Sequence, residues 1–200
     1  MKAFWWVLAV GLMGCSPCGR SPAVAVEPTE KTSIPAIVSI SIEDEKSLAL
    51  GKTARVTLRI IPDADATRMT VRFTQTGGVA FDSKPELTLG AVKAGQAGAA
   101  DVAARLAQPG KAEIRGWFEA YDSAGAQLFA GSRALYLIVT ANRVLVGDSS
   151  FMALELAELD RRLKTGEITA QEHARQVQRL HTAGAAETIY LSVPGDTSRK

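Results

Sequence analysis

The chain has 200 residues, of which 46% are hydrophobic and 22% are charged. These proportions are typical of a folded globular protein and argue against disorder along the whole length. The 23 basic and 21 acidic residues give a net charge of +2, so the charge balance does not indicate a nucleic-acid-binding protein. The chain contains two histidines and two cysteines, which leaves little material for a metal centre or a nucleophilic triad.

The N-terminus has the pattern of an export signal. Lys2 precedes an uncharged, apolar run from Ala3 to Leu12. As a helix, about ten residues span roughly 15 Å, which is about half the hydrocarbon thickness of a bilayer. The run is therefore too short for a membrane span and predicts a signal peptide over residues 1–14.

The residues that end this run, Leu12-Met13-Gly14-Cys15, resemble the lipobox of bacterial lipoproteins. The resemblance implies cleavage before Cys15 and lipidation of that residue, which makes the lipid bilayer a partner of the chain. Ser16 follows the cysteine, and in such lipoproteins the lack of Asp at this position implies an outer-membrane location, facing the periplasm. Several acyl chains on one residue anchor a protein stably, whereas one chain alone binds weakly.

Two other fates of the N-terminus stay open at this point. Ala23-Val24-Ala25 fits a peptidase site whose cleavage would release a soluble secreted protein. An uncleaved N-terminal anchor is the other alternative, although the short apolar run disfavours it. Cys18 would be the only free thiol of the lipidated chain, either as an unpaired tether residue or as a site of intermolecular pairing.

The middle of the chain predicts a β-sandwich on a tether. Residues 15–34 are rich in Ser, Pro, Thr and charge, a composition that forms no packed core, so we expect a disordered tether. Over residues 35–146 the hydrophobic period is two, so each predicted strand has one buried and one solvated face. The clearest runs are residues 38–42, 54–60, 69–74, 100–106, 112–121 and 134–140. The sequence therefore predicts a mainly β fold with an antiparallel sandwich of about seven strands.

Residues 36–140 resemble the broad immunoglobulin-like class of bacterial extracytoplasmic domains in the number of strands and their turns. The resemblance implies an immunoglobulin-like sandwich. Trp117 and Tyr121 share one face of a predicted strand. Large aromatic residues usually fill cores, so we expect Trp117 in the core. The alternative is an exposed platform on which Trp117 and Tyr121 bind a glycan.

Residues 147–183 have a helical period and predict a C-terminal α-helical hairpin. We expect its second helix to end near Gly184, and residues 184–200 to form a tail. Residues at steps of four, three and four give the first helix one apolar stripe, which is a candidate partner-binding surface. The stripe consists of Met152, Leu156, Leu159 and Leu163.

Cap residues delimit both predicted helices. Asp148 or Ser149 is the expected N-cap of the first helix, and Gly166 is its expected C-cap. Thr169 and Glu172 have the spacing of a capping box, which predicts the start of the second helix.

The segment Leu159–Glu172, together with Leu180, is similar to the SHOCT family of short C-terminal helical pairs. The shared features are Leu-x3-Leu, then Gly, then Ile-Thr, then Glu three residues later. The resemblance implies self-association or contact with a partner. The alternative is that the hairpin packs on the sandwich.

The sequence offers few candidates for chemistry. Cys15 and Cys18 have the C-x-x-C redox spacing, but the first sulfur is expected to be acylated. Asp63 and Asp65 share a loop, but two carboxylates are too few for a calcium site without backbone help. The sequence has no HExxH, phosphate-loop or G-x-S-x-G motif. We therefore expect no catalytic residue, no metal site and no cofactor.

Together these patterns favour a non-enzymatic lipoprotein of the cell envelope. We expect it to bind another envelope protein, or a second copy of itself, through the stripe Met152/Leu156/Leu159/Leu163 or a free sheet edge. The main alternative is a carbohydrate-binding envelope module that uses Trp117 and Tyr121. Nucleic acid is not an expected partner, because the export signal separates the protein from it.

Overall fold

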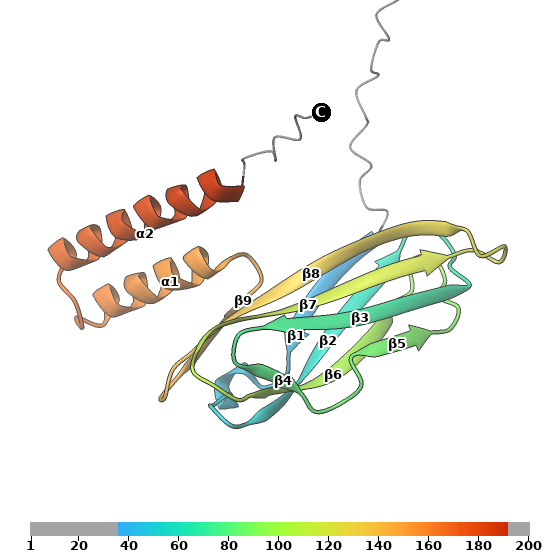
Figure 1. Ribbon diagram of the computed structural model, residues 1–200, viewed down its shortest axis with the longest axis horizontal. Helices are drawn as coiled ribbons and strands as arrows, with labels where there is room; N and C mark the ends of the chain where they lie inside the picture. Colours follow the sequence, from blue (N-terminus) through green and yellow to red (C-terminus); the bar gives the residue numbers. More distant parts are fainter. Residues whose placement is uncertain (1–35, 192–200) are drawn as a thin grey trace, which may run out of the picture. The chain divides into compact units, whose positions relative to one another are not determined.

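A computed structural model describes residues 36–191, in which two antiparallel β-sheets are followed by two helices (Figure 1). This arrangement confirms the predicted fold class. The first sheet has the strand order β1-β2-β6-β4, and the second has the order β5-β3-β7-β8-β9. The first sheet contains β1 (Ala36–Ile42), β2 (Thr53–Pro62), β4 (Val79–Phe81) and β6 (Gly98–Leu106). The second contains β3 (Arg68–Thr76), β5 (Glu86–Leu89), β7 (Gly110–Tyr121), β8 (Gln127–Val139) and β9 (Val144–Gly147).

The strand order is that of an immunoglobulin-like sandwich. Strands β1, β2, β6 and β4 take the places of A, B, E and D, and β5, β3, β7 and β8 take those of C′, C, F and G. One feature differs, because β4 precedes β5 in the sequence, so the D-like strand comes before the C′-like one. Strands β4 and β9 are additional to the seven or so strands that the sequence predicts. They have 3 and 4 residues, too few for an alternating pattern to stand out in the sequence.

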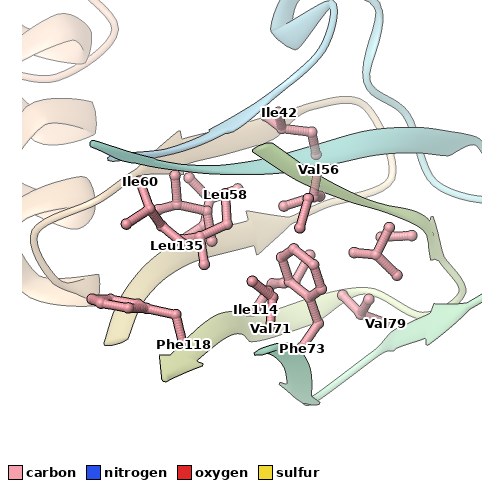
Figure 2. Packing of buried hydrophobic residues seen from close by; sticks show 14 of the residues in the cluster. Ile42, Val56, Leu58, Ile60, Val71, Phe73, Val79, Ile114, Phe118 and Leu135 are labelled. Carbon is pink, nitrogen blue, oxygen red and sulfur yellow. The ribbon is translucent and has the colours of Figure 1, made fainter. Parts of the chain in front are cut away.

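The core lies between the two sheets and is made by the inward residues of the alternating runs. Figure 2 shows side chains from β2, such as Val56 and Leu58, facing Val71, Phe73 and others from the second sheet. No polar or charged side chain is buried among the described residues. Full burial of one such apolar side chain contributes about 1.5–3 kcal/mol, so this layer holds the two sheets together.

The expectation that Trp117 fills the core is wrong. Trp117 is 43% exposed, because the inward positions of β7 are taken by its neighbours Gly116 and Phe118. Gly116 leaves no room for a side chain there, since a Cβ would lie 2.9 Å from a methyl carbon of Leu58. The alternation of β7 therefore turns Trp117 to the outer face of the five-stranded sheet.

The two helices are α1 (Phe151–Lys164) and α2 (Ala170–Leu191). Ser150 caps α1, because its Oγ accepts a hydrogen bond from the Ala153 amide at 3.1 Å. The cap therefore lies beyond both expected residues, Asp148 and Ser149. No helix within residues 36–191, α1 and α2 included, is long and apolar enough to cross a membrane.

The predicted capping box is confirmed, and α1 ends one residue earlier than expected, because Thr165 is its C-cap and Gly166 is the next residue. Gly166 has φ +74°, and the amides of Gly166 and Glu167 donate to the carbonyls of Leu163 and Arg162, which makes a Schellman motif. Thr169 and Glu172 form the capping box through reciprocal bonds of 3.0 and 3.2 Å.

Helix α2 is longer than the sequence suggested. It continues past Gly184, where we expected it to end, to Leu191. A single glycine inside a helix costs only about 1 kcal/mol relative to alanine, and the residues that follow Gly184 include good helix formers.

Candidate functional site

Helix α1 packs on the outer face of the five-stranded sheet, at the end formed by β8 and β9. The rings of Phe151 on α1 and Tyr136 on β8 meet edge to face, with 5.0 Å between centroids. Lys111 on β7 lies 5.6 Å from the centre of the Phe151 ring and forms an ion pair of 3.0 Å with Glu155. These contacts fasten the helical hairpin to the sandwich.

Helix α2 packs against α1, and the hairpin that the two helices form has a small apolar interior. Leu159 and Ile168 are both buried, at 6% and 7% exposure. His173 on α2 and Asp160 on α1 are joined by a contact of 2.8 Å between Nε2 and Oδ1. The hairpin is therefore held by apolar packing together with a polar link.

A network of ion pairs holds the turn of the hairpin. The Arg161 guanidinium binds Glu158 at 2.9 Å and Glu167 at 2.6 Å, and Arg143, just before β9, binds Glu158 at 2.6 Å. The hydrogen bond from Arg161 lowers the pKa of Glu158. Two hydrogen bonds, a stronger one from Arg161 and a weaker one from Thr165, lower the pKa of Glu167 to about 2.

A groove of about 480 Å³ lies between β8, β9, α1 and α2. Apolar side chains from all four elements line it, together with polar groups. The carboxylates of Glu155 and Glu158 are already bound by Lys111, Arg143 and Arg161. The apolar lining residues are Ile138, Leu145, Leu159 and Leu180, and the polar ones include Arg143, Glu155, Glu158, Arg162, Gln176 and Arg179.

The predicted stripe on α1 is not one exposed surface. Leu159 is buried and lines the groove, whereas Met152 is 39% exposed. Leu156 and Leu163 are half-buried. The stripe is divided because α1 lies between the sheet and α2, so that two sides of the helix are covered.

Sequence reasoning missed the contributions of β8 and β9 to the groove. The sequence predicts Ile138 within an apolar strand. The face of β8 on which Ile138 lies is covered because α1 packs there. Leu145 belongs to β9, which was not predicted. For the side of the groove formed by α2, the sequence offers one signal, which is the apolar pattern of that helix with Leu180 in it.

Trp117 and Tyr121 lie on a separate part of the same outer face, away from α1. Their side chains leave β7 on the same side, with Glu119 between them. Tyr121 is half-buried and donates a hydrogen bond of 2.5 Å to Glu119, which raises the pKa of the tyrosine. Trp117 borders a second hollow of about 420 Å³.

The remaining candidate residues from the sequence are Cys15, Cys18 and Asp65, of which the structure describes Asp65. Cys15, the predicted lipidation site, and Cys18 lie outside the described residues. Asp65 fastens its own loop, because it binds Lys93 at 2.7 Å and the Ala94 amide at 2.9 Å, and these bonds lower its pKa. Within residues 36–191, no three His, Cys, Asp or Glu side chains gather in a way that could hold a metal ion.

Comparison with known proteins shows a likeness only to solved structures. No family model and no curated protein matches the chain. The C-terminal part of native alpha-2-macroglobulin from Escherichia coli matches 54% of this chain with 19% identity and a TM-score of 0.46, and the match covers 17% of that chain. A FixG-related protein from Vibrio parahaemolyticus matches 54% of this chain with 13% identity and a TM-score of 0.35, over 99% of that chain. These likenesses carry no inference about function.

The ion pair between Arg161 and Glu167 predicts a pH effect on the hairpin. Because the folded-state pKa of Glu167 is lowered from 4.5 to about 2, its stabilising effect is complete above about pH 4.5 and is lost as the pH falls towards 2. Titration of the Glu167 carboxyl by NMR should give a midpoint near 2, and Arg161→Ala should return the midpoint towards 4.5.

Arg162→Ala is the matched control for this titration. Arg162 is a neighbouring arginine whose Nε is 3.8 Å from Glu167, so its loss should move the midpoint much less. Equal shifts in the two variants would contradict the assigned network.

Proposed function

We propose that the protein is a lipid-anchored, non-catalytic interaction module of the bacterial cell envelope. The lipobox-like Leu12-Met13-Gly14-Cys15 supports attachment to a bilayer through acylated Cys15. Ser16 after the cysteine supports an outer-membrane location with the protein facing the periplasm. In this arrangement the sandwich is a rigid support that carries the helical hairpin.

The observation that carries the proposal is the groove between the hairpin and the edge of the five-stranded sheet. Its apolar lining of Ile138, Leu145, Leu159 and Leu180 favours apolar side chains of a partner. The hairpin that forms one side of the groove is joined to the sheet by contacts that include the Phe151–Tyr136 ring pair. A groove formed in advance lowers the cost of ordering on binding.

The charges at the groove indicate the chemistry of its occupant. Glu155 and Glu158 are tightly paired with basic residues. Arg162 is paired less closely, because its Nε is 3.8 Å from a carboxylate oxygen of Glu167. Arg179 lines the groove from an exposed position on α2. Guanidinium groups bind carboxylates in bidentate fashion. The occupant is therefore an amphipathic segment of another envelope protein that carries Asp or Glu beside its apolar anchors.

Lipid attachment is tested by metabolic labelling of cells with a radioactive fatty acid. The parent chain should incorporate label and begin at Cys15, and Cys15→Ser should incorporate none. Cys18→Ser is the matched control and should be labelled like the parent. An unlabelled parent chain, or one that begins at Met1, would contradict the proposed anchoring.

Partner binding is tested by placing a photo-crosslinking residue at Gln176, which lines the groove. In intact cells it should give one main product with a partner protein, cross-linked at a segment that contains acidic residues. Arg179→Glu should reduce this product at least about fivefold, because it places a negative charge beside the partner's carboxylates.

Arg175→Glu is the control, since Arg175 is exposed one turn away on α2 and does not line the groove. It should leave the product unchanged. A cross-linked product that Arg179→Glu does not reduce, or one with twice the mass of this chain, would contradict the proposal that the groove binds an acidic segment of another protein.

A further inference from the structure

Trp117 occupies the centre of the part of the outer face that α1 leaves open. On β7 its register partner is Arg72 of β3 on one side and Ser132 of β8 on the other. Both neighbouring strands are hydrogen-bonded to β7, so the position of the residue is fixed by the sheet. An indole that is 43% exposed at such a rigid position is available to a ligand.

The polar groups around the indole are also held in place. The Arg115 guanidinium lies 5.7 Å from the centre of the Trp117 ring and is hydrogen-bonded to Glu113 at 2.8 Å. On the other side, Glu119 accepts the hydrogen bond of Tyr121, and Arg68 stacks on that tyrosine at 4.5 Å. Glu119 is thus oriented beside the tryptophan without being neutralised by a direct ion pair among the described residues.

Small residues on β8 create space next to the ring. Ala130 is the register partner of Glu119 and Gly131 that of Phe118, and both line the hollow of about 420 Å³. This volume falls within the range of roughly 300–1,000 Å³ that is typical of small-molecule sites. The polar part of the lining consists of Thr70, Arg72, Glu86 and Glu119.

We propose that this hollow binds a pyranose ring of a neutral glycan, with the C–H face of the sugar stacked on Trp117. Each sugar hydroxyl both donates and accepts hydrogen bonds. Arg72 offers only donors, and Glu86 and Glu119 offer only acceptors, so the hollow supplies both kinds of partner. The lining has one guanidinium and two carboxylates, and the nearby Arg115 and Arg68 are accompanied by Glu113 and Glu119. The local charges therefore give no net positive field that would favour an anionic ligand.

The same composition disfavours a protein as the occupant of this hollow. The cores of protein interfaces are depleted in glutamate, whereas two glutamates border Trp117 here. The hollow and the groove at the hairpin are made by different residues, with Trp117 and Glu119 lining the first and Leu159 and Arg179 the second. Glycan binding is therefore an activity additional to the proposed protein interaction and does not depend on it.

The test uses the intrinsic fluorescence of Trp117. The chain has three tryptophans, of which Trp5 and Trp6 lie in the predicted signal peptide. Trp5→Phe and Trp6→Phe in the full chain therefore leave Trp117 as the only tryptophan whether or not that peptide is cleaved. Titration with chitohexaose and with cellohexaose should produce a saturable change in fluorescence for at least one of them. Calorimetry with the same sugars supplies the affinity.

Three variants locate the binding. Trp117→Ala should weaken the affinity at least about tenfold, because it removes the stacking surface, and Glu119→Gln should weaken it several-fold. Leu128→Ala is the matched control, since Leu128 is 40% exposed on β8 and does not line the hollow. Its affinity should equal that of the parent.

Two results would overturn the proposal. One is the absence of saturable binding to either sugar by a folded chain, and the other is binding that Trp117→Ala leaves unchanged. The Arg179→Glu variant separates this test from that of the groove, because it should bind sugar like the parent. Loss of the cross-linked protein product in Trp117→Ala, without sugar binding in the parent, would assign this face to a protein partner instead.

Discussion

The packing of α1 on the outer face of the five-stranded sheet separates that face into the two candidate sites. A β-sandwich buries one face of each sheet, and its other faces are normally solvated. Here Phe151 against Tyr136, and Lys111 against Phe151 and Glu155, cover one end of that outer face. The covered end becomes the floor of a groove, and the open end exposes Trp117. One helix contact thus divides a sheet into two surfaces of different chemistry.

Electrostatics then fix the geometry of the hairpin. Arg161 holds Glu158 and Glu167 at once, and Arg143 ties the same network to the turn before β9. Exposed ion pairs contribute little individually, but a shared guanidinium with several partners restricts the positions of all of them. The same pairing satisfies the acidic side chain of Glu158 at the groove. Arg179 lines the same groove from an exposed position on α2.

The sequence predicted the parts of this fold that are encoded locally. The alternation of β2 and β3 identified the residues of the core, and Gly166, Thr169 and Glu172 marked the helix ends because each signal acts within a few residues. The candidate site was predicted less well, because it depends on contacts between distant segments. Trp117 is exposed because Gly116 and Phe118 fill the inward positions of β7, and the α1 stripe is divided because two partners cover it. Neither fact follows from the period of one strand or one helix.

The docking of α1 on the sheet is a separate, cohesive contact that creates the groove. Amide hydrogen exchange of the Phe151→Ala variant tests it most directly. The account predicts that α1, α2 and β9 lose protection together, while β2, β3, β6 and β7 keep the protection of the parent. Protection that is retained in both helices, or lost equally throughout the sandwich, would contradict it.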